Sequence, residues 1–228
     1  MRSALDDRTA AARIRDAAID QWGQRGFDVG LRAIADAAGV SAALVIHHFG
    51  SKDGLRRACD DHVTGAIREA KSEQMQTPDP AAWFAQMAEI ESYAPLMAYL
   101  VRSLQSGNQL ARDFWQQMMA NAEAYIDEGV RSGLLKPSRD PHARARYLAM
   151  ASGGSFLLYL QLHQSPDLRQ VLRDYAEEMV LPALEVYTQG LMVDSTMYDA
   201  FLARREEGIP FSSAAQGDDD DGSDDATP

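Results

Sequence analysis

The chain has 228 residues, 46% of them apolar, which is enough for the core of one large domain or two modest ones. No stretch approaches the roughly 18 to 20 uninterrupted apolar residues of a membrane span, and the first residues lack the apolar run of a signal peptide, so we expect a soluble cytoplasmic protein. A single cysteine, Cys59, excludes an internal disulfide framework and a multi-thiolate metal site, and it fits a reducing compartment.

The formal net charge of −12 is distributed unevenly along the chain. Residues 1–60 hold nine Lys or Arg and eight Asp or Glu, whereas residues 206–228 hold eight acidic residues and no basic one. The N-terminal segment is therefore weakly positive, which permits contact with nucleic acid without predicting it. Because residues 206–228 have little apolar content, we predict a disordered acidic tail, which is either a solubilising extension or a competitor with DNA for basic surface.

The N-terminal segment predicts three helices. The first runs from about Arg8 to Arg25, and the second, shorter helix covers Leu31–Ala38 and ends at Gly39. Ser41 is then well placed to accept a hydrogen bond from the free amides of a third helix, Ala42–His48. This order is the helix-turn-helix pattern, in which the second helix of the pair enters the major groove of DNA. The pattern alone fits a plain structural hairpin about equally well.

The rest of the chain also has helical periodicity, so the predicted fold class is all-α. Ser51 favours the start of a fourth helix at Lys52, which runs to about Glu73 and reads as a connector. Glycine and proline then separate further predicted helices, which cover Ala81–Ser92, Pro95–Ser106, Asn108–Ser132, Pro141–Gln164, Pro166–Gln189 and Ser195–Arg205.

Four segments resemble, in order and nearly in spacing, the signature of the TetR family of transcriptional regulators. They are Ile14–Trp22, Arg25–Phe27, Ile34–Ser41 and His48–Leu55. The resemblance implies a homodimer with two DNA-reading heads and two helical bodies that bind a small effector, usually with repression relieved by the ligand. It divides the chain into a three-helix DNA-binding head at 8–55, an effector-binding and dimerisation bundle at 56–205, and the acidic tail.

Three residues depart from the family pattern. Ile46 stands where a tyrosine usually reaches a phosphate, and Gly30 stands where a capping threonine often lies. Leu44 replaces a common threonine, so polar reading of bases by the third helix is reduced. Apolar approach and DNA shape then carry more of the specificity. The predicted DNA-binding residues are Gly30, Arg32, Ser41, Ala42, Ala43, Leu44, Ile46, His47, His48 and Lys52.

Two of these predictions have alternatives. His47 is the main polar candidate for a base edge, whereas His48 is equally well explained as a histidine packed between helices. Lys52 could be a solvated charge, but a cation is electrostatically misplaced at a helix start, which favours a phosphate contact.

Large apolar side chains are dense in the middle helices. Each one is most simply explained as core, but methionine and aromatic residues also suit an apolar pocket for an amphipathic organic effector. The pair Gly153-Gly154 marks a place where a helix or a ligand approaches closely. Met119, Tyr147 and Met150 belong to the same dense set of large side chains. The candidate effector residues are Trp83, Phe84, Met87, Met97, Leu100, Leu104, Phe114, Trp115, Met118, Tyr125, Phe156 and Tyr159.

The last two long predicted helices are the candidates for dimerisation, since they carry more apolar surface than a monomer usually exposes. Pro182 should kink the last of them or begin a new segment. Cys59 and His62 lie three residues apart, but no second Cys or His cluster completes a metal site. We therefore expect no metal, no cofactor and no enzymatic activity. The main rival interpretation is a helical dimeric interaction protein without DNA binding.

Overall fold

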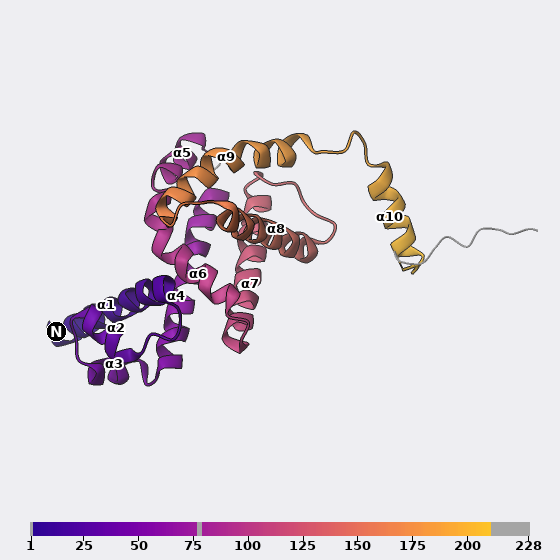
Figure 1. The fold of residues 1–228 in the computed structure, drawn as a ribbon. Coiled ribbons are helices and arrows are strands. Elements are labelled where there is room, and N and C mark those ends of the chain that lie inside the picture. Colours follow the sequence, from indigo (N-terminus) through magenta and orange to yellow (C-terminus); the bar gives the residue numbers. More distant parts are fainter. Residues whose placement is uncertain (1, 77–78, 211–228) are drawn as a thin grey trace, which may run out of the picture. The chain divides into compact units, whose positions relative to one another are not determined.

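The computed structural model describes residues 2–76 and 79–210, with side chains from Thr9 onward. These residues form α-helices joined by short turns and one 3-10 helix, and no strand occurs within the described ranges, which confirms the all-α class (Figure 1). The chain divides into two compact units, residues 1–180 and residues 181–228. The predicted acidic tail falls mostly on residues 211–228, which lie outside the described part of the chain.

Four helices make up the N-terminal part of the first unit. They are α1 (Arg2–Arg25), α2 (Leu31–Ala38), α3 (Ala42–Phe49) and α4 (Lys52–Gln76). The turns between them follow from local sequence. Gly39 adopts the left-handed conformation, with φ of 66°, in which its amide caps the end of α2. The Ser41 hydroxyl accepts from the Leu44 amide at 3.2 Å, which confirms Ser41 as the cap of α3.

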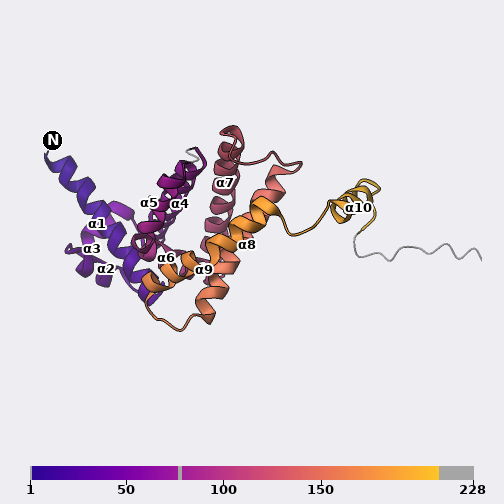
Figure 2. The same ribbon diagram turned by 90° about the horizontal axis from the view of Figure 1, so that it is seen from above.

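The remaining helices are α5 (Pro80–Ala88), the 3-10 helix η1 (Ile90–Tyr93), α6 (Ala94–Gln105), α7 (Gln109–Arg131), α8 (Pro141–Leu162), α9 (Leu168–Gln189) and α10 (Thr196–Glu206). Side chains of Asp79, Asn108 and Asp140 cap α5, α7 and α8. The turned view shows α7 and α8 side by side (Figure 2).

The structure differs from the sequence prediction most clearly at three places. The first helix begins at Arg2 instead of Arg8, and the predicted helix Ala81–Ser92 is divided at Glu89 into α5 and η1. Pro182 lies inside α9 and does not begin a new segment. A proline removes one backbone donor, and Glu178, whose carbonyl loses that donor, is exposed, so water can satisfy the carbonyl.

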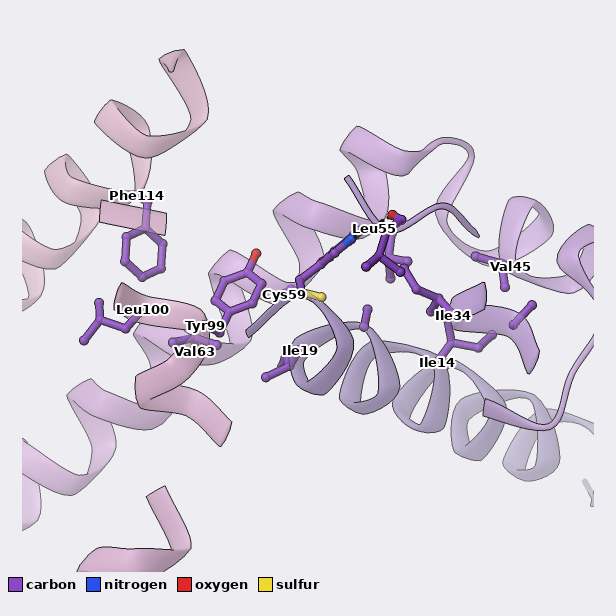
Figure 3. Packing of buried hydrophobic residues seen from close by; sticks show 14 residues of the cluster. Ile14, Ile19, Ile34, Val45, Leu55, Cys59, Val63, Tyr99, Leu100 and Phe114 are labelled. Carbon is purple, nitrogen blue, oxygen red and sulfur yellow. Dashed lines mark hydrogen bonds between the residues drawn. The ribbon is translucent and has the colours of Figure 1, made fainter. Parts of the chain in front are cut away.

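The main hydrophobic core joins the head, residues 8–55, to the helices that follow it. Ile34, Val45 and Leu55 of the head are wholly buried in the same cluster as Tyr99 of α6 and Phe114 of α7. Figure 3 shows this cluster running from Val45 to Phe114. A second, smaller core joins α6, α8 and the first part of α9 through Val101, Phe156 and Val171. The head is therefore packed directly against the helices of the body.

Candidate nucleic-acid interface and ligand cavity

The helix-turn-helix is held together by its inner apolar residues. Ile34 and Ala35 of α2 and Val45 of α3 are fully buried, and Val40 of the turn packs against the same core. The small Ala35 lets the two helices cross closely. Because the inner face of α3 is fixed in this way, its opposite face is the one that can meet a groove of DNA.

The outer face of α3 is mainly apolar. Ile46 is 46% exposed and Ala43 is also exposed, while Leu44 is half-buried. His47 is the exposed polar side chain of this face. His48 is half-buried, and its ring lies 6.0 Å from the Phe49 ring, so it packs at the edge of the head. The arrangement offers close apolar approach and a single imidazole for hydrogen bonding.

The predicted phosphate contacts flank α3. Gly30 and Arg32 are exposed at the start of α2, where no side chain caps the first amides. Free amides at a helix start bind anions well. Lys52 is half-buried at the start of α4, and Ser51 accepts from the Gly54 amide at 3.0 Å. Ser41 and Ala42 precede the exposed face of α3, with Ser41 exposed and Ala42 half-buried.

A buried polar network lies behind the head. Tyr99 of α6 donates its hydroxyl proton to Asp60 of α4 at 2.7 Å, and Asp60 pairs with Arg56 at 3.9 Å. The guanidinium of Arg56 lies 3.4 Å from the centre of the Phe27 ring and donates to Ser106 at 3.4 Å. The network therefore joins α4, α6 and the segment before α2. The sequence did not predict that Arg56 and Asp60 are buried, because charged residues are usually exposed.

Burial shifts the acidity of this network. Burial raises the pKa of Asp60 from 3.8 to about 6, against the Tyr99 hydrogen bond and the nearby Arg56, which lower it. Burial, and then the charge of Asp60, raises the pKa of Tyr99 far above its ordinary value, so its hydroxyl is a proton donor at any physiological pH. Burial likewise raises the pKa of Cys59, which keeps this thiol protonated and unreactive.

A cavity of about 800 Å³ opens between the end of α6, α7 and α8. Apolar side chains form much of its wall, and Arg112, His142 and Arg146 add basic groups. A Cβ at Gly153 or Gly154 would meet nothing within 4 Å, so the glycine pair widens the cavity instead of marking a helix crossing. The lining residues are Leu104, Gly107, Ala111, Arg112, Trp115, Gln116, Met119, Ala120, Glu123, His142, Arg146, Met150, Gly153, Gly154 and Leu157.

A second cavity of about 430 Å³ adjoins the first along α7. Both cavities are lined by Ala120 and Glu123, and Glu123 contacts His142 at 3.0 Å. The smaller one extends past Asp127 and Arg144 to the segment before α8.

The structure places the candidate effector residues in several locations. Of the candidates, Leu104 and Trp115 line the larger cavity, together with Met119 and Met150 of the same dense set of large side chains. Leu100 and Phe114 are buried in the main core, Met97, Leu104 and Met118 pack against it, and Phe156 and Tyr159 belong to the smaller core. Phe84 is 74% exposed, and Tyr147 is exposed as well. Trp83, Met87 and Tyr125 are half-buried.

Sequence reasoning missed the basic groups of the cavity. Arg112 and Arg146 lie on different helices, α7 and α8, and only the packing of these helices brings them to one wall. The helical periodicity of each segment contains no such information.

Several apolar side chains of the later helices are exposed. In the first unit, Leu158 is 61% and Leu162 is 73% exposed on α8. In the second unit, Leu184 and Val186 of α9 and Leu191 after it are exposed too. By contrast, Val171 and Leu172 of α9 are buried within the chain and are not available to a partner.

The described residues offer neither a metal site nor a membrane span. No group of three or more His, Cys, Asp or Glu side chains that could hold a metal ion occurs among them, and Cys59 and His62 gain no further ligand. None of the described helices is long and apolar enough to cross a membrane.

Two family profiles match this chain. The family described as "Bacterial regulatory proteins, tetR family" matches residues 14–59, which cover the second half of α1, α2, α3 and the start of α4. The domain described as "Tetracyclin repressor-like, C-terminal domain" matches residues 91–193, which include α6, α7 and α8. The two matches therefore contain the candidate interface and the larger cavity, respectively.

The chain is also similar to individual proteins. It is 68% identical over 209 residues to the HTH-type transcriptional regulatory protein RaaS of Mycobacterium tuberculosis, covering 91% of this chain and 98% of that protein. It is 36% identical over 123 residues to the regulator BetI of Brucella canis, covering 46% of this chain and 60% of that protein. The structure of FadR from Bacillus subtilis in complex with stearoyl-CoA has a similar fold, with a TM-score of 0.54 and 17% identity, covering 79% of this chain and 99% of that one.

Proposed function

This chain belongs to the TetR family, whose members are helix-turn-helix regulators of transcription and not enzymes, and on that premise we propose that it is a homodimeric repressor released from its operator by an amphipathic organic effector. The observation that carries the proposal is the pairing of an exposed α3 face with a cavity on helices that share the core of the head. Within this proposal, residues 8–55 read DNA, residues 56–205 bind the effector and the second subunit, and residues 206–228 are an appended tail.

DNA recognition depends on contacts at the two flanks of α3 and on close apolar approach in between. Lys52, Arg32 and the uncapped amides that begin α2 contact phosphates. Ala43 and Ile46 approach methyl groups and sugars, and His47 provides a polar contact to a base edge. Because one small head buries too little surface for tight binding, two heads reading two half-sites are needed.

Dimerisation uses the exposed apolar side chains of the last long helices. Leu158 and Leu162 on α8, and Leu184 on α9, are side chains that a partner subunit would cover. Burying apolar surface of this kind contributes roughly 25 cal/mol per Å². The alternative is that each exposed leucine is an isolated surface residue, and a monomer in light scattering would support it.

The effector occupies the larger cavity. Its volume of about 800 Å³ lies in the range of ligand pockets for small organic molecules. The apolar Trp115, Met119 and Met150 would contact the greater part of the molecule, and Arg112 and Arg146 would orient a polar or acidic group. The ligand named for the FadR structure, stearoyl-CoA, is an amphipathic molecule of this general class, and the shared fold makes it a reasonable first compound to test.

A second function has one observation in its favour. Gly30, Leu44 and Ile46 stand where family members usually have hydroxyl groups that contact DNA. The rival proposal is therefore a dimeric interaction protein that no longer binds DNA.

A gel-shift assay with the promoter fragment of the protein's own gene separates the two functions. The regulator predicts a retarded complex that Lys52→Ala, Arg32→Ala and His47→Ala each weaken, because these residues make the phosphate and base contacts. Lys136→Ala, an exposed charge in the segment between α7 and α8, is the matched control and should leave binding unchanged. Absence of a complex with DNA from the gene's whole neighbourhood would support the interaction protein.

A further inference from the structure

We propose that Tyr99 is the residue that couples the cavity to the DNA-reading head, by holding Asp60 of α4 through its hydroxyl while its ring lies in the core of the head. This inference rests on the proposed function, since it takes the cavity as the effector site and α3 as the DNA-reading element. It adds the side chain through which ligand binding in the cavity affects the position of α3.

The hydroxyl group of Tyr99 links the middle of α6 to a charged side chain of α4, whereas Arg56 contacts Ser106 just past the end of α6. The Tyr99 hydroxyl donates to Asp60 at 2.7 Å and lies 3.3 Å from the Arg56 carbonyl oxygen. Tyr99 is wholly buried, and Asp60 is buried as well. A buried carboxylate that loses its donor is strongly disfavoured. Tyr99 and Asp60 must therefore move together, or the bond must break as a discrete event.

The ring of Tyr99 carries this link into the head. It packs edge-on against Phe27 with ring centroids 5.5 Å apart, and it lies 6.5 Å from the Trp22 ring. Trp22 donates its indole proton to the Val29 carbonyl at 3.1 Å, just before α2. The guanidinium of Arg56 covers Phe27. A displacement of Tyr99 thus reaches the segment that sets the start of α2.

The cavity lies at the other end of the same helix. Leu104, a lining residue, follows Tyr99 on α6 by about one and a half turns. On α7, the ring of Phe114 lies 6.5 Å from that of Tyr99, and its neighbour Trp115 lines the cavity. Figure 3 shows Phe114 and Tyr99 in the same cluster. A ligand that displaces the wall at α6 or α7 therefore acts on Tyr99 along α6 or through Phe114.

The crossing of α1 and α6 leaves little room for α6 to move independently. A Cβ at Gly23 would stand 2.9 Å from the Cβ of Ala98 and 3.0 Å from the Tyr99 amide nitrogen. Arg102 also donates to the Gly23 carbonyl at 3.3 Å. Close-packed helices of this kind switch between discrete arrangements instead of deforming gradually, so a shift of α6 is transmitted to α1.

The test replaces the unidentified effector with a side chain built into the cavity. Gly154→Trp places an indole where a Cβ meets no atom within 4 Å, and it should occupy part of the cavity without disturbing the core. The affinity for the promoter fragment and the amide hydrogen exchange of residues 31–49 are measured for the wild type, Gly154→Trp, Tyr99→Phe and the double variant. Thermal melts confirm that each variant is folded.

We expect Gly154→Trp to change promoter affinity by about tenfold or more and to alter hydrogen exchange in α2 and α3. Tyr99→Phe keeps the ring but lacks the hydroxyl, so Gly154→Trp should change affinity less than about threefold in that background. An equal effect of Gly154→Trp in both backgrounds overturns the proposal. So does the absence of any effect of Gly154→Trp on the head of the wild type.

Matched variants separate coupling from simple loss of packing. Asp60→Asn retains an oxygen that accepts from Tyr99 and should preserve the response to Gly154→Trp, whereas Asp60→Ala should abolish it. Tyr175→Phe removes a hydroxyl that contacts Ser155 within the body, at 2.6 Å, and should leave the response intact. If the wild type binds no promoter DNA, the proposed function fails, and the hydrogen-exchange cycle still decides whether Tyr99 couples the two sites.

Discussion

Gly54 packs so closely against Phe49 that a Cβ atom at residue 54 would overlap the Phe49 carbonyl oxygen. This contact closes the turn between α3 and α4 and thereby sets Lys52 beside the end of α3. Only a residue without a side chain fits here, so the position of a predicted phosphate contact depends on a glycine two residues further along the chain.

Replacing this glycine should damage both stability and DNA binding. We expect Gly54→Ala to lower the free energy of unfolding by about 1 to 3 kcal/mol, since the backbone must shift to relieve the overlap, and to weaken promoter binding. Urea unfolding and gel shifts measure the two effects. Gly65→Ala is the matched control on the same helix, where a Cβ meets no atom within 4 Å, and it should stabilise the protein by about 0.5 to 1 kcal/mol. Equal behaviour of the two variants would contradict the role of Gly54.

The exposed Ile46 offers a gain-of-function test. Its side chain is 46% exposed, so a larger residue fits at this position without disturbing the core. Ile46→Tyr supplies the hydroxyl that the family pattern has here, and a hydrogen bond to a charged phosphate should increase promoter affinity by roughly tenfold. Ile46→Phe supplies the ring alone and should give less than half of that gain. The prediction fails if the two variants bind promoter DNA equally well.

Asp60 should give the stability of the protein a specific pH dependence. Its pKa is raised in the folded state, from 3.8 to about 6, so the folded state holds the proton more tightly than the unfolded state does. The contribution of this group is therefore fully present below about pH 4 and is lost as the pH rises through about 6. Asp113 and Asp61 favour the protonated form as well, whereas Arg56 and Tyr99 oppose it.

Asp60→Asn removes this titration and keeps the shape of the side chain. The free energy of unfolding of the variant, minus that of the wild type, should increase between pH 4 and pH 6.5 and then level off. Urea titrations at several pH values test the slope. A difference that stays constant across this window would show that the buried carboxyl does not titrate there.

If the exposed leucines of α8 form the dimer interface, negative charges introduced at these positions should prevent dimerisation. Leu158→Glu combined with Leu162→Glu should convert the protein from dimer to monomer in light scattering at micromolar concentration, because a buried unpaired carboxylate is costly. Promoter affinity should fall together with dimerisation. Gln105→Glu, at an exposed position at the end of α6, adds the same charge elsewhere and should leave the dimer intact. Unchanged mass of the doubly substituted protein would place the interface on another surface.

The local architecture of the head was predictable because its signals are short-range. Gly39 and Ser41 act on residues within one turn of themselves, and the structure confirms the turn between α2 and α3 that they predict. The end of α1 at Arg25 and the bounds of α2 were predicted correctly for the same reason.

The cavity and the network behind the head depend on long-range packing. Periodicity shows that α7 has an apolar face, but not where that face meets another helix and where it opens. Phe114 and Trp115 are adjacent in the sequence, yet one is buried in the main core and the other lines the cavity. Arg56 and Asp60 are charged residues of the kind that usually lie on an exposed helix face. They form a buried pair because Tyr99 of α6 packs against them.

The continuity of the main core limits how freely this regulator can be recombined with its relatives. A chimera that exchanged only residues 8–55 would inherit Trp22 and Phe27 from one parent and the Tyr99 and Arg56 that cover them from another. Such a hybrid should fold poorly unless α4 and α6 come from the same parent as the head. The exchangeable cassette for building sensors from this protein is therefore larger than its DNA-reading motif, and its boundary lies beyond Gln105.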